Sequence, residues 1–199
     1  EKIWFDKSTD GGKTWLAEDR VVADQPGGWD FANPGLSRCD GMPITAVDLS
    51  DGPHRGTIYV NWADQRNGED DTDIFVAYSE DGGTTWSEPV RVNDDKAGKH
   101  QFLTWMAVDP VSGFIYTVFY DRRNHDKIDT DVYLGYSTDG GRTFTNQKIS
   151  EESFKPTSMA FFGDYNNISA YNGVVRPIWT RMDKGQLSIW TALIDHQRQ

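Results

Sequence analysis

An eight-residue motif, here called the octet, occurs three times along this chain and constrains its fold more than any other feature. Its pattern is Ser-x-Asp-Gly-Gly-x-Thr followed by Trp or Phe, and it occupies residues 8–15, 79–86 and 137–144. Each copy follows a run rich in apolar residues and precedes a second β-prone stretch. Strand, Asp-Gly-Gly turn and strand together predict a β-hairpin at each copy.

The residue types of the octet are those that a tight turn needs. Paired glycines supply positive φ, and the aspartate carboxylate can accept hydrogen bonds from the N–H groups of the turn. The aromatic residue at the eighth position is expected to bury its ring against the hairpin. We therefore expect structural rather than catalytic or metal-binding roles. The positions concerned are Ser8, Asp10, Gly12, Trp15, Ser79, Asp81, Gly83, Trp86, Ser137, Asp139, Gly141 and Phe144.

The repeat extends upstream of the octets. Residues 44–48 match 105–109, and residues 56–62 match 113–119. One repeat unit is thus predicted to contain four short strands, A to D, with the octet joining C to D. No segment shows sustained helical periodicity, so the sequence predicts an all-β fold of four-stranded antiparallel units.

Four-stranded units of this length are typical of β-propeller blades. With its three octets matching Ser-x-Asp-x-Gly-x-x-Trp/Phe, the chain resembles the Asp-box (BNR-repeat) β-propellers of the sialidase-like superfamily over nearly its whole length. The resemblance implies that the octets are structural turns, lying on the side of the propeller opposite its active face.

The strand count predicts a single, incomplete propeller domain over residues 1–199, with about three and a half blades. Residues 1–25 supply two strands of a first blade, and residues 164–194 supply three strands of a last one. Residues 40–95 and 100–150 each supply a complete blade. By the resemblance, the chain is expected to be the C-terminal half of a six-bladed parent. The remainder of the propeller, or another chain that completes it, is therefore an expected partner.

Composition excludes several classes of function. The chain has 199 residues, with 20 Lys and Arg against 31 Asp and Glu, for a formal net charge of −11. Such a charge repels phosphate backbones, so no nucleic-acid partner is expected. No apolar run approaches the roughly 18 residues of a membrane span. The resemblance implies an extracellular or cell-surface protein.

The resemblance places ligands on the face formed by the D-to-A and B-to-C loops. The B-to-C loops repeat the frame Asp-x-Arg-Asn, a gap, then Asp-Thr-Asp, at residues 64–73 and 121–131. Two interpretations stay open: Asp–Arg pairs brace the loops, or the arginines face an anionic or hydroxyl-rich ligand. The candidate ligand-binding residues are Asp40, Arg66, Gln101, Trp105, Asp121, Arg123, Asp164 and Arg181.

Polar and aromatic groups at the starts of the inner strands suit a sugar, because carboxylates bind hydroxyls and aromatic rings pack on sugar faces. Capping of the exposed loop backbone is the alternative role. No metal site is expected from the histidine spacing, and no cofactor is expected. Calcium binding by the Asp-Thr-Asp carboxylates is the one exception left open. Those residues are Asp71, Asp73, Asp129 and Asp131.

The favoured function is glycan recognition, with no catalysis by this chain alone. The alternative, implied by the resemblance, is part of an exo-sialidase-like glycoside hydrolase with a Tyr nucleophile, an activating Glu and an arginine cluster. Residue type alone nominates Tyr120, Tyr165, Glu151, Arg123 and Arg181 for those roles. A purely structural interaction module is the third alternative.

Overall fold

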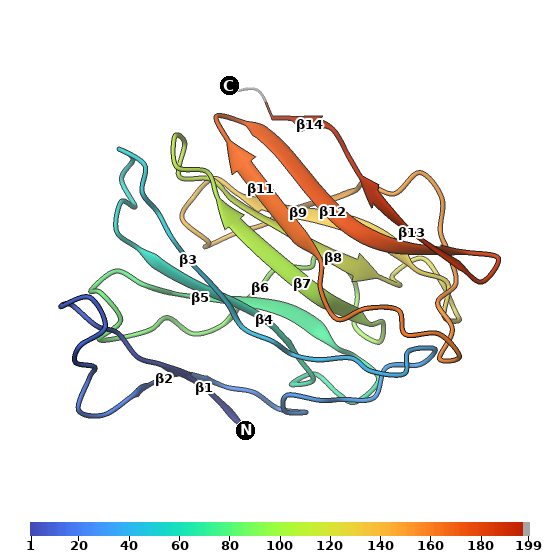
Figure 1. The fold of residues 1–199 in the computed structure, drawn as a ribbon, viewed down its shortest axis with the longest axis horizontal. Coiled ribbons are helices and arrows are strands. Elements are labelled where there is room, and N and C mark those ends of the chain that lie inside the picture. The colour runs from blue at the N-terminus through green and yellow to red at the C-terminus, as the bar shows by residue number, and fades with distance from the viewer. Residues whose placement is uncertain (197–199) are drawn as a thin grey trace.

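The computed structural model describes residues 1–196, which consist of strands, turns and loops (Figure 1). Fourteen strands are present in this part of the chain. They are β1 (Lys2–Phe5), β2 (Arg20–Asp24), β3 (Ile44–Val47), β4 (Ile58–Asp64), β5 (Asp73–Ser79), β6 (Val90–Arg91), β7 (Gln101–Val108), β8 (Ile115–Asp121), β9 (Asp131–Ser137), β10 (Thr145–Lys148), β11 (Asn167–Tyr171), β12 (Val174–Asp183), β13 (Gln186–Thr191) and β14 (Ile194–Asp195).

The strands form four antiparallel sheets, which we call blades I to IV in chain order. Blade I is the pair β1–β2, blade II has the order β3-β4-β5-β6, and blade III has the order β7-β8-β9-β10. Blade IV has the order β11-β12-β13, and the short β14 pairs with the start of β12 beyond the end of β13. In blades II and III the chain therefore passes through each sheet from one edge to the other.

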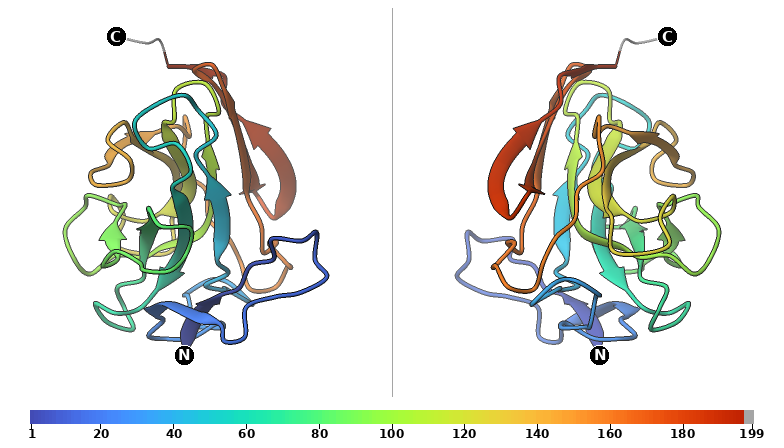
Figure 2. Two further views of the ribbon diagram at one scale, coloured as in Figure 1. Left: turned by 90° about the vertical axis from the view of Figure 1, so that its left-hand side faces the viewer. Right: turned by 90° about the vertical axis from the view of Figure 1, so that its right-hand side faces the viewer.

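The first strands of blades II, III and IV lie at the centre of the assembly. Strand β7 contacts β3 and β4 of blade II and β11 of blade IV. Successive blades are arranged side by side, and β1 and β14 lie at opposite ends of the molecule (Figures 1 and 2). The starts of β3, β7 and β11 therefore define what we call the axial region. The loops that lead into these strands, the D-to-A loops, surround it.

Burial follows the position of each strand. Strand β8 is rich in β-branched and aromatic residues, and all seven of its residues are buried because it lies inside blade III with blades on either side. All six residues of β13 are exposed, because no further blade covers it within residues 1–196. The main hydrophobic core joins blades II, III and IV, and a smaller core joins blade I to blade II.

One glycine illustrates how the octet fits between blades. Gly83 has φ of +86°, and a Cβ atom at this position would lie 2.2 Å from the Phe5 ring of blade I. A side chain there would therefore meet both backbone strain and a steric clash.

Residues 1–196 contain no helix of the length and apolarity that a membrane crossing requires.

Candidate functional site

The three octets adopt the same hydrogen-bonded turn. In the third octet, Ser137 Oγ donates to Asp139 Oδ1 at 2.7 Å, and Gly141 N donates to Ser137 Oγ at 2.9 Å. Asp139 Oδ1 also accepts from the backbone N–H groups of Arg142 and Thr143, each at 3.0 Å. The same bonds recur in the first and second octets. These carboxylates are thus fully engaged within their own turns.

The hydrogen bonds also set the ionisation of the octet aspartates. Donors from Thr14 and Ser8 lower the pKa of Asp10 to about 2. The pKa of Asp81 is lowered for the same reason, chiefly by the hydroxyl and backbone of Thr85. In Asp139, donors led by Thr143 outweigh burial, and the pKa falls to about 2. All three carboxylates are therefore held in the charged form that the turn requires.

The expected burial of the octet aromatic residue is wrong for Trp15, which is 60% exposed. In the second octet, Trp86 packs edge-on against Phe5 of the preceding blade, with ring centroids 5.3 Å apart. Phe144 packs against the main core. Trp86 thus packs against a neighbouring blade, and residues 1–196 place no blade before blade I that could cover Trp15.

The three arginines predicted as ligand contacts lie near the ends of β4, β8 and β12: Arg66 and Arg123 follow the strand, and Arg181 lies two residues before its end. Each guanidinium lies over an aromatic ring of the next strand in its own blade. The distances from guanidinium carbon to ring centroid are 4.2 Å for Arg66 over Phe75, 4.2 Å for Arg123 over Tyr133, and 4.6 Å for Arg181 over Trp190. Each arginine also pairs with an aspartate two residues away along the chain: Asp64, Asp121 and Asp183 respectively.

These arginines also connect each blade to the one before it. Arg66 Nη2 donates to the carbonyl of Asp24 in blade I at 3.1 Å. Arg123 pairs with Asp94, which follows blade II, and Arg181 pairs with Glu152, which follows blade III. These contacts agree with the interpretation in which the arginines brace the loops. Each guanidinium group is bonded to its own nearby carboxylates or backbone, and the three groups do not meet in one shared site.

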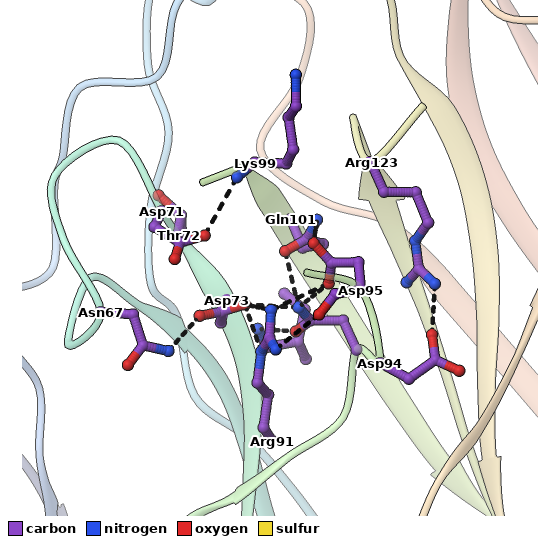
Figure 3. Close-up of polar contacts among 12 residues, drawn as sticks. Asn67, Asp71, Thr72, Asp73, Arg91, Asp94, Asp95, Lys99, Gln101 and Arg123 are labelled. Carbon is purple, nitrogen blue, oxygen red and sulfur yellow. Dashed lines mark hydrogen bonds and ion pairs between the residues drawn. The ribbon is translucent and has the colours of Figure 1, made fainter. Parts of the chain in front are cut away.

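Gln101, the first residue of β7, belongs to a buried polar network between blades II and III (Figure 3). Asp121, the last residue of β8, contacts this network. Both are fully buried, and Gln101 Nε2 contacts Asp121 Oδ1 at 3.3 Å. Gln101 also donates to Asp95 at 3.1 Å and accepts from Asn93 at 2.8 Å. Burial raises the pKa of Asp121, although Arg123 opposes the shift. Their ligand-binding role is thus not supported by this geometry, because their polar groups are used internally.

The Asp-Thr-Asp carboxylates, for which calcium binding was left open from the sequence, have basic or backbone partners. Asp73 pairs with Arg91 at 2.6 Å, and Asp131 pairs with Lys148 at 2.8 Å. Asp71 accepts from the backbone of Lys99. Within residues 1–196, no group of three or more His, Cys, Asp or Glu side chains has an arrangement that could hold a metal ion.

Tyr120 is not positioned as a nucleophile. Its hydroxyl donates to the carbonyl of Thr180 in blade IV at 2.8 Å and accepts from the Thr180 N–H at 3.0 Å. Full burial raises the pKa of this phenol far above its usual range. Its hydrogen bonds involve no glutamate, and Glu151 lies exposed on a loop. Tyr120 therefore joins two blades, and the expected Tyr–Glu pair is not formed there.

Two of the predicted ligand-binding carboxylates do come together. Asp40 precedes β3, and Asp164 precedes β11; they are 4% and 8% exposed. Arg38 contacts Asp164 Oδ2 at 3.4 Å, whereas Asp40 Oδ2 and Asp164 Oδ1 have no hydrogen-bond partner in residues 1–196. Burial raises the pKa of Asp40, and the charge of Asp164 adds to this effect. Two buried acceptor atoms beside the axial region thus lack a hydrogen-bond partner in residues 1–196.

An aromatic residue, Tyr165, directly follows Asp164 in the chain and packs against a second ring. The rings of Trp105 on β7 and Tyr165 are perpendicular, with centroids 6.3 Å apart, and Tyr165 is 60% exposed. We call Arg38, Asp40, Trp105, Asp164 and Tyr165 the axial cluster. It combines unpaired acceptors with exposed aromatic surface, the combination that sugar-binding sites use.

Backbone strain lies close to the axial cluster. Leu103 on β7 has φ of +50° at an irregularity in the pairing of β7 with β8. Such a conformation costs a branched residue about 1–3 kcal/mol and is concentrated at functional sites. Its carbonyl accepts from Asn166 Nδ2 at 2.6 Å, which fixes the loop carrying Asp164 and Tyr165 against β7.

The sequence interpretation missed Arg122, which is 3% exposed and lies between the two predicted residues Asp121 and Arg123. A signal was present: in the other copy of the frame, Gln65 occupies the equivalent position. Because Arg122 and Gln65 differ at the same position of the repeat, the repeated structure does not itself require an arginine there.

The sequence matches no model of a known protein family. Solved structures similar to this chain include the GH93 α-L-arabinofuranosidase of Fusarium graminearum in complex with arabinobiose, at 15% identity and a TM-score of 0.55, covering 98% of this chain and 55% of that one. The Hadza microbial sialidase Hz136 matches at 18% identity and a TM-score of 0.53, over 99% of this chain and 40% of that one.

The Penicillium chrysogenum α-L-arabinanase complexed with arabinobiose matches at 15% identity and a TM-score of 0.53, over 95% of this chain and 51% of that one. The chain spans about half the length of the solved structures it matches. The common feature is the fold, because identity is low throughout. The chain is therefore an all-β, incomplete β-propeller built from four-stranded antiparallel blades.

Proposed function

We propose that this chain recognises carbohydrate through the axial cluster and is not catalytic by itself. The observation that carries the proposal is the pair Asp40 and Asp164, two buried carboxylates whose Oδ2 and Oδ1 atoms have no partner in residues 1–196. Sugar hydroxyls would donate to these atoms, and the rings of Trp105 and Tyr165 would pack against the sugar. Ligand contacts would offset the cost of two unpaired buried acceptors.

The structural neighbours support a carbohydrate ligand. They include an α-L-arabinofuranosidase, an α-L-arabinanase and a sialidase, although their activities do not transfer through a shared fold alone. We further propose an Asp-box protein of the sialidase-like superfamily, with this chain as the C-terminal half of its propeller, acting outside the cell or on its surface. The remainder of that propeller would complete the site.

A glycoside hydrolase is the second candidate, and one observation favours it. Burial raises the pKa of Asp40, and a second carboxylate, Asp164, lies close enough to add to the shift. A carboxylic acid with a raised pKa beside a second carboxylate is the arrangement of many glycosidases. In that case the full-length parent would cleave fluorogenic glycosides, and Asp40→Asn would abolish turnover.

The recognition proposal is tested by a glycan array followed by calorimetric titration of the strongest neutral oligosaccharide. Asp164→Asn keeps the shape of the side chain but removes its charge, and we expect at least about tenfold weaker binding, roughly 1.4 kcal/mol. Glu88→Gln, an exposed charge change in blade II, is the matched control and should have no effect. Equal affinity of Asp164→Asn and the wild type would contradict the proposal.

The proposed site uses carboxylates and aromatic rings without a cofactor. We therefore expect the measured affinity to stay unchanged after exhaustive treatment with EDTA. A loss of binding that added Ca²⁺ restores would show that the Asp-Thr-Asp carboxylates, or the axial pair, hold a cation instead.

A further inference from the structure

A buried arginine without a carboxylate partner lies beneath the loop face. Arg122 Nη1 donates to Asn33 Oδ1 at 2.7 Å, and Nε donates to Thr130 Oγ1 at 3.2 Å. Its Nη2 is a buried donor without a partner in residues 1–196. A buried unpaired donor on a charged group calls for an acceptor beside it.

The electrostatic setting of Arg122 differs from that of its neighbours in the repeat. Arg66, Arg123 and Arg181 each pair with an aspartate, whereas Arg122 forms no ion pair in the described residues 1–196. Burial lowers the pKa of Arg122 to about 10, so it remains charged at neutral pH. A buried charge without an ion pair carries a desolvation penalty of several kcal/mol. The Phe102 ring, 4.8 Å from the guanidinium carbon, and the charge of Asp129 offset part of this penalty, and a bound anion would offset more.

Arg122 lines a small cavity of about 220 Å³ with further basic side chains around it. The cavity lies between the loop before β7 and the loop after β8. Its other charged or titratable lining residues are Asp70, Lys99, His100, His125, Asp126 and Lys127. Lys99 is already paired with Asp126 at 3.2 Å, and Asp131 contacts the ring of His125 at 3.1 Å.

The remaining charged lining residues are Arg122 and Lys127 against Asp70. From outside the lining, the charge of Asp129 acts on Arg122 and that of Asp71 on His100. His100 adds a neutral donor. The Thr72 hydroxyl accepts from the Gln65 amide at 3.2 Å and contacts His100 Nδ1 at 3.0 Å. If the Thr72 hydroxyl donates its proton to His100 Nδ1, then His100 Nε2 carries the ring proton. Burial and the charge of Arg122 both lower the pKa of His100 and so favour the neutral ring.

We propose that this cavity binds an oxyanion, the sulfate ester or carboxylate of an acidic sugar, with Arg122 as its principal positive charge. The identification with a sugar rests on the proposed carbohydrate function, whereas the oxyanion site rests on Arg122 alone. Guanidinium groups suit both anions because their N–H donors match paired oxygen atoms.

Calorimetric titration of the full chain with galactose 6-sulfate, glucuronic acid and galactose, at constant ionic strength, tests the proposal and separates the two anions. We expect at least one acidic sugar to bind about tenfold or more tightly than galactose, because the charged hydrogen bonds are desolvated. Sodium sulfate should compete with that sugar. Equal affinity for all three sugars would overturn the oxyanion site.

Surface variants test the location without disturbing the buried residue. Lys127→Glu should weaken the acidic sugar about tenfold, and Asp70→Asn should strengthen it about threefold, because both alter charge at the cavity. Lys13→Glu, in the first octet, makes the same charge change as Lys127→Glu far from the cavity and should have no effect. If Lys127→Glu and Lys13→Glu weakened binding of the acidic sugar equally, the change in net charge alone would explain the loss, and the proposal would be contradicted.

Arg122→Met tests the principal donor directly, with circular dichroism reporting whether the variant folds. A folded variant should lose the preference for acidic sugars. The two proposals fail separately: loss of neutral-sugar binding in Asp164→Asn concerns the axial cluster, whereas loss of acidic preference in Lys127→Glu concerns this cavity. Neutral binding without acidic preference would leave the proposed function intact and refute the further inference.

Discussion

At the residue scale, one carboxylate in each octet organises a whole turn. Asp139 accepts four hydrogen bonds from its own octet, two of them from backbone N–H groups. We predict that Asp139→Asn lowers the free energy of unfolding by about 1–2 kcal/mol, because the charged acceptor is lost. Urea denaturation at pH 7 measures the change, and Glu88→Gln is the control.

The same variant has a pH dependence of known sign. The pKa of Asp139 is about 2 in the folded chain, below the value of about 3.9 for an unfolded aspartate. Its stabilisation is therefore complete above the unfolded pKa and is lost as the pH falls through the folded pKa. The difference between wild type and Asp139→Asn should shrink between pH 5 and pH 2, about the interval spanned by these pKa values. A difference that grows on acidification would contradict this account.

Tyr120 supplies a second test at this scale. Tyr120→Phe removes the hydroxyl that bonds both backbone groups of Thr180, and we expect a loss of about 1–3 kcal/mol in stability with glycan affinity unchanged. Tyr171→Phe, at a tyrosine that is 66% exposed, should cost almost nothing. Loss of binding or turnover without loss of stability would instead restore a functional role for the phenol.

At the element scale, the ends of the strands are connected by ion pairs that cross from blade to blade. Arg123→Met should cost about 3–5 kcal/mol, because it leaves fully buried Asp121 without its cationic partner. A double-mutant cycle with Asp94→Ala should give a coupling of about 1 kcal/mol. The exposed pair Arg55–Asp51 should give less, and equal couplings would show that Arg123 does not join the blades.

The sequence predicted the strands and the turns because both depend on local chemistry. Alternating β-prone runs and the Asp-Gly-Gly octets determine strand, hairpin and strand without reference to distant residues. The partners of polar groups depend on neighbouring blades instead. Asp40 and Asp164, about 120 residues apart in the sequence, were nominated from their equivalent places before inner strands, and the fold brings them together with unpartnered oxygen atoms. Gln101 occupies such a place too, but its amide is bonded within a buried network.

Adjacent arginines show the same limit. Arg122 and Arg123 are indistinguishable by residue type, yet Arg123 is neutralised by aspartates and Arg122 is not. Only the comparison between repeat copies separates them, because Gln65 replaces Arg122 while Arg66 matches Arg123. The exposure of Trp15 was likewise hidden from the sequence, since the surface that covers an octet aromatic residue belongs to another blade.

At the scale of the whole molecule, the blades place two distinct sets of groups on opposite sides. The octets hold their carboxylates in closed hydrogen-bonded turns between C and D strands, whereas the axial cluster and the Arg122 cavity lie on loops at the other ends of the strands. Of the ten buried side-chain polar atoms without a partner in residues 1–196, four lie in the loops before β3 and β11: those of Asn33, Asp40, Asp164 and Asn166. This distribution is the basis for placing a ligand there.

Hydrogen exchange of the full chain, with and without the strongest neutral oligosaccharide from the glycan array, tests that placement most directly. The account predicts slower exchange in residues 38–42 and 162–168, which carry Asp40 and Asp164, and unchanged exchange in the three octets. Slower exchange confined to the octets, with residues 38–42 and 162–168 unaffected, would contradict it.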